Sequence, residues 1–149
     1  MNRAETIEIS AVIPAFNEEE ALPPLLDEVF AVLNELNRPF EVIVIDDGST
    51  DGTPAFLERR RETTPGLRVL TLVPNSGQTA AFEAGFSAAR GEFLITMDAD
   101  GQNDPADIPH MMELTPGVDA VLGCGAKRQD PWIRTFAQKT ANAIRNRLL

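Results

Sequence analysis

Runs of β-branched and apolar residues alternate along this chain with runs of helical periodicity, and this alternation restricts the fold more than any other feature of the sequence. Ile7–Pro14 and Phe40–Ile45 have the composition of buried strands. Between them, apolar residues recur at helical spacing from Leu22 to Leu36. Strand–helix–strand alternation predicts an α/β fold with a mostly parallel sheet and helices on both faces, in three layers.

The alternation continues along the rest of the chain. Further strands are predicted at Leu67–Val73, Glu92–Met97 and Val118–Leu122, and further helices at Thr53–Glu62, Gly77–Arg90, Pro105–Glu113 and Trp132–Leu148. Asn17 is expected to cap the first helix, and Gly91 to stop the helix that begins at Gly77. The sequence has no repeat or linker, so residues 1–149 are expected to form a single domain.

The amount and distribution of charge indicate which partners the chain can bind. A net charge of −10 argues against nucleic-acid binding. Residues 127–149 carry six Lys or Arg side chains against one Asp, which suits a phosphate, a membrane surface or simply a solvated amphipathic helix. No secretory signal or membrane span is evident, so a cytoplasmic location is expected, with peripheral contact at the inner face of the membrane as an option. Cys124 and His110 are expected to be structural.

Polar segments follow the predicted strands rather than precede them. These segments are Pro14–Glu18, Asp46–Ser49, Asn75–Gln78 and Asp98–Asp104. In open parallel sheets, ligands bind beyond the carboxyl ends of the strands. The sequence therefore predicts a binding site at this edge of the sheet.

The segment Asp98-Ala-Asp100 comes directly after an apolar strand. Two carboxylates there, with Gln102 two residues further on, are hard oxygen ligands of the kind that Mg²⁺ or Mn²⁺ prefers. Such an ion could neutralise a diphosphate leaving group. A loop of solvated acids is the alternative, because the spacing of two Asp residues alone is a weak signal.

A second acidic pair, Asp46 and Asp47, ends the second predicted strand. A carboxylate there can accept a hydrogen bond from a nucleobase N–H or a ribose hydroxyl. The other functional interpretation is a phosphorylation site in a receiver-type signalling module. The chain has neither a G-x-G-x-x-G after its first strand nor a GxxxxGK[ST] segment, so dinucleotide and P-loop binding are disfavoured.

These segments together resemble family 2 glycosyltransferases, which have the GT-A fold. The resemblance rests on Ile13–Glu18, Ile45–Thr53, Asn75–Gln78 and Asp98–Pro105, which occur in that order over nearly the whole chain. The subgroup that the chain resembles most is the polyprenyl-phosphate sugar transferases, of the dolichol-phosphate mannosyltransferase kind. The resemblance implies inverting transfer of a sugar from a UDP- or GDP-linked donor to a polyprenyl phosphate.

The resemblance also implies roles for individual residues. Asp98 and Asp100 would be the catalytic pair, and with Gln102 they would hold Mg²⁺ or Mn²⁺ and, through it, the diphosphate. The residues implied in donor binding are Pro14, Ala15, Phe16, Glu18, Asp46 or Asp47, Gln78, Ala99 and Arg128. A lipid phosphate is already an anion, so no strong general base is expected.

The chain departs from the family pattern near its C-terminus. Relatives usually carry Arg where Gly125 stands, and Ser where Gln138 stands or near Thr140. They also continue beyond the position of Leu149 with acceptor-side elements, so the acceptor-side part is expected to be missing here. A donor-binding remnant without turnover is therefore carried as an alternative to an active transferase.

Overall fold

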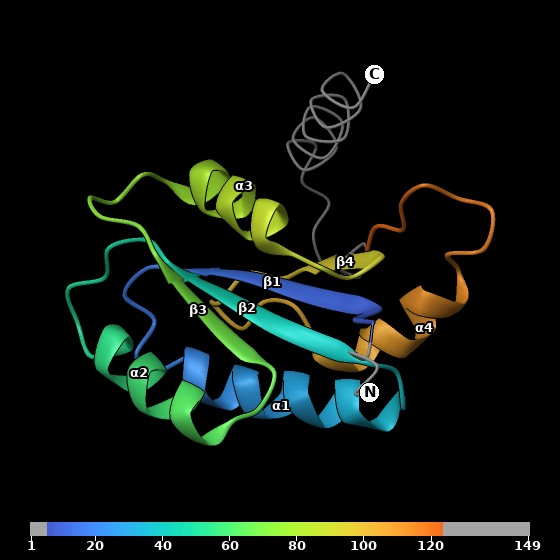
Figure 1. Ribbon diagram of the computed structural model, residues 1–149, viewed down its shortest axis with the longest axis horizontal. Coiled ribbons are helices and arrows are strands. Elements are labelled where there is room, and N and C mark those ends of the chain that lie inside the picture. The colour runs from blue at the N-terminus through green and yellow to red at the C-terminus, as the bar shows by residue number, and fades with distance from the viewer. Residues whose placement is uncertain (1–5, 124–149) are drawn as a thin grey trace, which may run out of the picture.

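The computed structural model describes residues 6–123 of the chain (Figure 1). The elements in chain order are β1 (Ile9–Ala15), α1 (Leu22–Glu35), β2 (Phe40–Asp46), α2 (Thr53–Thr63), β3 (Leu67–Thr71), α3 (Gln78–Ala88), β4 (Phe93–Thr96), the 3₁₀ turn η1 (Pro105–Asp107) and α4 (Ile108–Glu113). Strands and helices alternate up to β4, as the sequence predicts, and their ends agree with the predicted ones to within a few residues.

The four described strands form one parallel sheet in the order β3-β2-β1-β4. β1 pairs with β2 and with β4, so that Val12 lies opposite Ile43 on one side and Thr96 on the other. β2 also pairs with β3, with Asp46 opposite Thr71. Because the strands are parallel and in register at this end, the loops that follow them meet along a single edge of the sheet (Figure 1).

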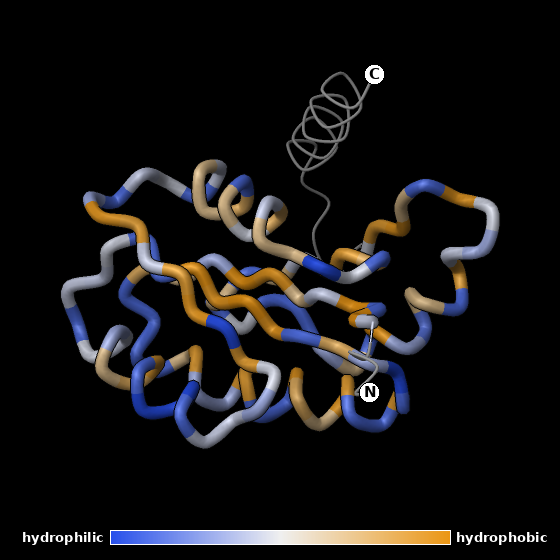
Figure 2. The backbone as a smooth tube through the Cα atoms, viewed as in Figure 1, coloured by the Kyte–Doolittle hydropathy of each residue, from blue (hydrophilic) through white to orange (hydrophobic). Residues whose placement is uncertain are grey.

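Helices cover both faces of the sheet, which confirms the predicted three-layer arrangement. α1 and α2 lie on one face and α3 on the other (Figure 1). Alternate residues of β1 serve the two layers, because side chains in a strand point to opposite faces. Ala11 and Ile13 pack with α1, whereas Val12 packs beneath α3 with Ile43. Figure 2 shows the hydrophobic residues concentrated along the central strands.

Two glycines allow α3 and the segment after it to lie close to the sheet. A Cβ at Gly85 would lie 2.4 Å from Cγ1 of Val12 and 2.8 Å from Cδ1 of Ile45. Gly91 was expected to stop the helix, but α3 ends at Ala88. A Cβ at Gly91 would lie 2.6 Å from the backbone nitrogen of Ser10, so this glycine is needed for a close approach to β1.

The sequence predicts a further strand and a further helix toward the C-terminus. The strand predicted at Val118–Leu122 is wrong, because this segment is irregular and leaves Val118 54% and Leu122 68% exposed. An apolar run becomes a strand only where a neighbour takes up its backbone hydrogen bonds, and no strand among residues 6–123 pairs with this segment. The helix predicted at Trp132–Leu148 lies outside the described residues. Within them, no helix is long and apolar enough to span a membrane.

Candidate functional site

The loops after β1 and β2 are joined by hydrogen bonds at the carboxyl edge of the sheet. Asn17 was expected to cap α1, but the helix begins at Leu22, and Asn17 instead has a left-handed backbone with φ of 56°. Its side-chain oxygen accepts a hydrogen bond from the Thr50 amide at 2.8 Å, and its own amide donates to Ser49 Oγ at 2.9 Å. The side-chain oxygen of Asn17, which could have capped a helix, thus bonds to the neighbouring loop instead.

Glu18 is held by the same pair of loops. Its amide donates to Thr53 Oγ1 at 2.9 Å, which fixes the backbone of the residue that follows Asn17. Burial raises the pKa of the Glu18 carboxyl, and the negative charges of Asp100 and then Asp51 raise it further. The negative charge of Asp100, in the loop after β4, therefore acts on the carboxyl of Glu18, in the loop after β1.

Asp98 and Asp100 lie in a turn that is ordered by neighbouring amide side chains. Gln78 Nε2 donates to Asp98 Oδ1 at 2.7 Å, and the Asp98 amide donates to Asn103 Oδ1 at 3.0 Å. Asp100 accepts hydrogen bonds from the backbone and the side-chain nitrogen of Gln102, at 3.0 and 2.5 Å. In this arrangement the amide nitrogen of Gln102, rather than its oxygen, faces Asp100.

Burial raises the pKa of Asp98, and the charge of Asp100 raises it further, while the hydrogen bond from Gln78 acts in the opposite direction. Within residues 6–123, no Lys, Arg or His side chain forms an ion pair with Glu18, Asp98 or Asp100. The described residues also contain no group of three or more His, Cys, Asp or Glu side chains placed to hold a metal ion. The edge therefore carries concentrated negative charge without a counter-charge from the described protein.

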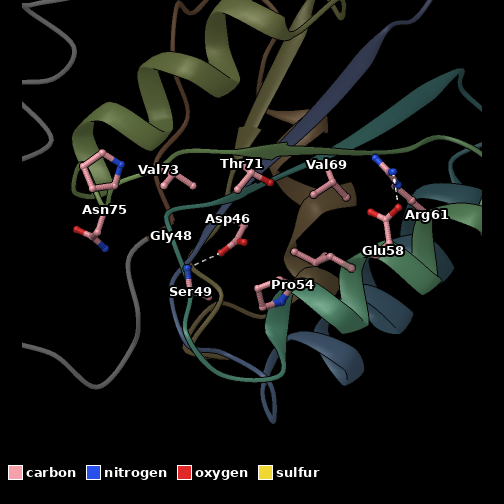
Figure 3. A pocket seen from close by; sticks show the side chains of 12 residues that line it. Asp46, Gly48, Ser49, Pro54, Glu58, Arg61, Val69, Thr71, Val73 and Asn75 are labelled. Atoms are coloured by element: carbon pink, nitrogen blue, oxygen red, sulfur yellow. Dashed lines mark hydrogen bonds and ion pairs between the residues drawn. The ribbon is translucent and has the colours of Figure 1, made fainter.

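The two adjacent acids at the end of β2 point to different faces of the sheet. Asp46 is 2% exposed and lines a cavity of about 450 Å³ between α2 and the end of β3 (Figure 3). Its Oδ1 accepts a hydrogen bond from the Ser49 amide at 3.0 Å. The cavity has apolar walls that include Pro54 and Val69, and Thr71 contributes a hydroxyl.

Asp47 is 3% exposed and faces the side of the sheet that α3 covers. Its Oδ1 and Oδ2 accept hydrogen bonds from the amides of Ser76 and Gly77, both at 2.7 Å. Its backbone carbonyl accepts from Asn75 Nδ2 at 2.9 Å. Asp47 therefore orders the loop that leads into α3, whereas the carboxylate of Asp46 borders open space.

The remaining residues singled out in the sequence lie at or near the same edge. Pro14 and Ala15 are buried at the end of β1, and Phe16 is 47% exposed just beyond it. Ala99 is 4% exposed and packs into the core on the α1 side. Arg128 lies outside the described residues, as do Gly125, Gln138 and Thr140.

Sequence reasoning missed several residues that shape this site. Asn103 holds the turn at Asp98, and Asp51 accepts from the amides of Thr53 and Glu19, at 2.9 and 3.2 Å. Asn and Asp side chains commonly bond to nearby amides in turns, so their positions just after strands were the available signal. Which amide each side chain bonds to depends on contacts between loops and cannot be read from their spacing.

Comparison with known proteins identifies the family. Residues 10–148 match the model of glycosyl transferase family 2. An undecaprenyl-phosphate 4-deoxy-4-formamido-L-arabinose transferase of Serratia proteamaculans (strain 568) is 40% identical over 148 residues, which make up 97% of this chain and 45% of that protein. A protein of the same description from Aeromonas hydrophila is 41% identical over 145 residues, 95% of this chain and 44% of that protein. The chain thus spans less than half the length of these relatives.

Solved glycosyltransferase structures share the fold. Glucosyl-3-phosphoglycerate synthase from Mycobacterium tuberculosis, in complex with UDP, superimposes with a TM-score of 0.59 at 25% identity, over 76% of this chain and 41% of that one. Mannosyltransferase PcManGT from Pyrobaculum calidifontis, in complex with GDP-Man and Mn²⁺, gives 0.51 at 32% identity, over 62% of this chain and 27% of that one. These likenesses confirm the expected GT-A fold, and together with the family match they mean that this chain belongs to glycosyl transferase family 2.

Proposed function

We propose that this chain forms the donor-binding part of a metal-dependent, inverting glycosyltransferase that moves a sugar from a UDP- or GDP-linked donor to a polyprenyl phosphate. The observation that carries the proposal is the turn at the carboxyl edge of the sheet that holds Asp98 and Asp100, which form no ion pair with a cation from residues 6–123. Uncompensated acids at a ligand-binding edge favour a divalent cation and the phosphates it carries.

The chemistry of these residues fits Mg²⁺ or Mn²⁺. Mg²⁺ is commonly bound by one or two carboxylates together with substrate phosphates, rather than by a cage made of protein alone. Asp98 and Asp100 supply two carboxylates, and a diphosphate would complete the set, which agrees with the lack of a three-residue group in the described chain. When bound, the ion would neutralise the charge that develops on the departing nucleoside diphosphate. Gln102 is proposed to join these ligands through its amide oxygen, while its amide nitrogen donates to Asp100.

The donor nucleoside would extend along the ends of β1 and β2. Phe16 offers a half-exposed ring on which a base can stack, beside Pro14, Ala15 and Glu18. Asp46 offers a carboxylate to a base N–H or a ribose hydroxyl, because its Oδ2 has no hydrogen-bond partner among residues 6–123 and borders the cavity. The backbone of Ala99, between the two acids, and Arg128 are proposed to approach the diphosphate.

The acceptor is proposed from the relatives, whose names describe transfer to undecaprenyl phosphate. A phosphate monoester is largely ionised at neutral pH, so its oxygen can attack the anomeric carbon without a strong general base. The basic residues of segment 127–149 are proposed to contact phosphate or an anionic membrane surface from the cytoplasmic side. The donor-binding remnant without turnover is retained as a second candidate, because Gly125 stands where the resemblance leads us to expect an Arg.

The proposal is tested by calorimetric titration of UDP and GDP, each with and without Mn²⁺, on the wild type and on Asp100→Asn. Asp119→Asn removes the same charge from an exposed position outside the site and serves as the control. We expect Mn²⁺-dependent binding of one nucleotide that falls at least about 100-fold in Asp100→Asn and is unchanged in Asp119→Asn. Failure of a folded wild-type chain to bind either nucleotide would contradict the proposal.

Transfer of labelled sugar to polyprenyl phosphate separates the two candidates. An active transferase forms the lipid-linked sugar, whereas a donor-binding remnant binds the nucleotide with Mn²⁺ and forms none.

A further inference from the structure

Asp47 and Asp98 are connected across the carboxyl edge of the sheet by a path made of hydrogen bonds and of the covalent backbone from Gly77 to Gln78. The path begins at Asp47, whose two carboxylate oxygens hold the amides of Ser76 and Gly77, and it ends at Asp98, whose Oδ1 accepts from Gln78 Nε2. It therefore connects the end of β2 to the end of β4, two strands that are not neighbours in the sheet.

The middle of the path is the start of α3. Gly77 precedes the helix with φ of 87° and ψ of 158°, a backbone conformation that side-chain-bearing residues rarely adopt. Its amide faces Asp47, and its carbonyl accepts from the amides of Ala80 and Ala81 at 3.0 and 3.1 Å. The position of Gly77 thus determines where α3 begins, and with it the position of Gln78.

The helix cannot easily shift to compensate. Gly85, two turns further on, lies directly against Val12 and Ile45, and Ala81 is fully buried between α3 and the sheet. Close packing resists sliding of the helix along the sheet. A displacement of the residues before α3 is therefore expected to move Gln78 relative to Asp98.

The choice of an amide at position 78 is also informative. A neutral N–H donor orients the carboxylate of Asp98 without supplying a positive charge. A Lys or Arg in the same place would compensate the charge of Asp98 and Asp100 and compete with a bound cation. The geometry suits a residue that aims a metal ligand through a hydrogen bond.

We propose that Gln78 is a positioning residue for Asp98, and that Asp47 acts on the same carboxylate indirectly by fixing the start of α3 through Ser76 and Gly77. This assigns the two acids at the end of β2 to different tasks, with Asp46 offered to the donor and Asp47 to the support of the metal-binding turn. The inference rests on the proposed function for its metal-binding readout but not for its structural one.

The test is a double-mutant cycle on the full chain with Gln78→Met and Asp47→Asn. Gln78→Met keeps the length of the side chain and removes the donor. Asn at position 47 has a single acceptor oxygen for two amides, so one of the two hydrogen bonds is lost. Thr79→Val, at the exposed next residue of α3, is the matched control.

We expect each single variant to weaken Mn²⁺ binding in the presence of nucleotide by about 10- to 100-fold. The Mn²⁺ affinity of the double variant is expected to lie within about twofold of that of the weaker-binding single variant, because the two residues act on one carboxylate. Additive losses would mean that Asp47 affects Mn²⁺ binding by a route other than the carboxylate of Asp98, and would overturn the proposal.

A second readout needs neither metal nor nucleotide. The side-chain amide ¹H–¹⁵N signals of Gln78 should shift toward their free-amide positions in Asp98→Ala and in Asp47→Asn, and stay in place in Thr79→Val. If the Gln78 signals do not move in Asp47→Asn, the proposed effect of Asp47 on Gln78 is wrong. If they move in a chain that binds no metal, the link from Asp47 to Gln78 is supported and only the proposed function is contradicted. If Asp47→Asn fails to fold, Gly77→Ala replaces it, since a Cβ there meets nothing within 4 Å and disturbs only the backbone conformation.

Discussion

Glu41, at the amino end of the parallel sheet, and Asp98, at its carboxyl end, have opposite electrostatic surroundings. At the amino end, Glu41 is 2% exposed and accepts hydrogen bonds from Ser10 Oγ, the Arg90 amide and the guanidinium of Arg68, each at 2.8 Å. At the carboxyl end, Asp98 receives a neutral amide from Gln78 and has the like charge of Asp100 nearby. A carboxylate matched with a cation stabilises the fold, whereas one left without a cation is available to a ligand.

The pKa values of these groups follow the same division. Burial alone would raise the pKa of Glu41, but the hydrogen bonds from Arg68, Ser10 and the Arg90 amide outweigh it and lower the pKa below 4.5. Burial and Asp100 raise the pKa of Asp98 above 3.8. The surroundings of Glu41 therefore favour its charged form, whereas those of Asp98 disfavour it.

The largest effect is expected from removing the carboxylate of Glu41 and the contacts it makes at the amino end of the sheet. Glu41→Ala leaves Arg68, only 29% exposed, without its carboxylate and removes the acceptor of the Arg90 amide. We expect the free energy of unfolding to fall by about 3 kcal/mol, measured by urea denaturation. Glu8→Ala, which breaks the half-exposed pair with Arg38, is the control and should cost less than about 1 kcal/mol. Equal losses of unfolding free energy in the two variants would contradict the claim that the carboxylate of Glu41 stabilises the fold more than a half-exposed ion pair does.

A smaller effect is expected from acid. Because the pKa of Glu41 is lowered in the folded chain, its contribution is fully present above the unfolded value of 4.5 and is lost as the pH falls through the folded value. Between pH 5 and 3 this loss should be on the order of 1 kcal/mol in the wild type and absent in Glu41→Gln. Urea denaturation at a series of pH values measures it, and parallel curves for the two proteins would show that Glu41 is not responsible.

The smallest effect has the opposite sign. Since the pKa of Asp98 is raised, its ionised form costs free energy in the folded chain, and this cost grows as the pH rises above 3.8. Asp98→Asn keeps an acceptor for Gln78 and removes the charge, so we expect Tm at pH 7 to rise by about 1–3 °C while Mn²⁺ binding is lost. A lower Tm would mean that Asp98 serves the fold rather than a ligand.

Much of this arrangement could be predicted from the sequence because parallel strands bring their carboxyl ends to one edge. From the sequence alone, that rule predicts that the segments Pro14–Glu18 and Asp98–Asp104 lie at the same edge. Contacts between loops are harder to predict from the sequence. Asn17 was assigned to a helix cap because caps are local, whereas its partner, Thr50, lies 33 residues away.

The different tasks of Asp46 and Asp47 follow from a one-residue alternation at the end of β2. The sequence marks both as a strand-end pair, but only the packing of α2 and α3 determines which face has a cavity and which has amides. The cluster at Glu41 was missed for a related reason. A single acid in an apolar strand gives no sign of the Arg, the hydroxyl and the amide that three other segments bring to it.

The contrast between the two ends is tested most directly by paramagnetic broadening of backbone amide NMR signals when Mn²⁺ is added with UDP or GDP. The account predicts strong broadening at Glu18 and at residues 98–102, with Glu41 and Arg68, at the far end of the sheet, unaffected. Broadening that is absent from residues 98–102, or equal at the two ends, would contradict the claim that the carboxyl edge is the metal- and nucleotide-binding site.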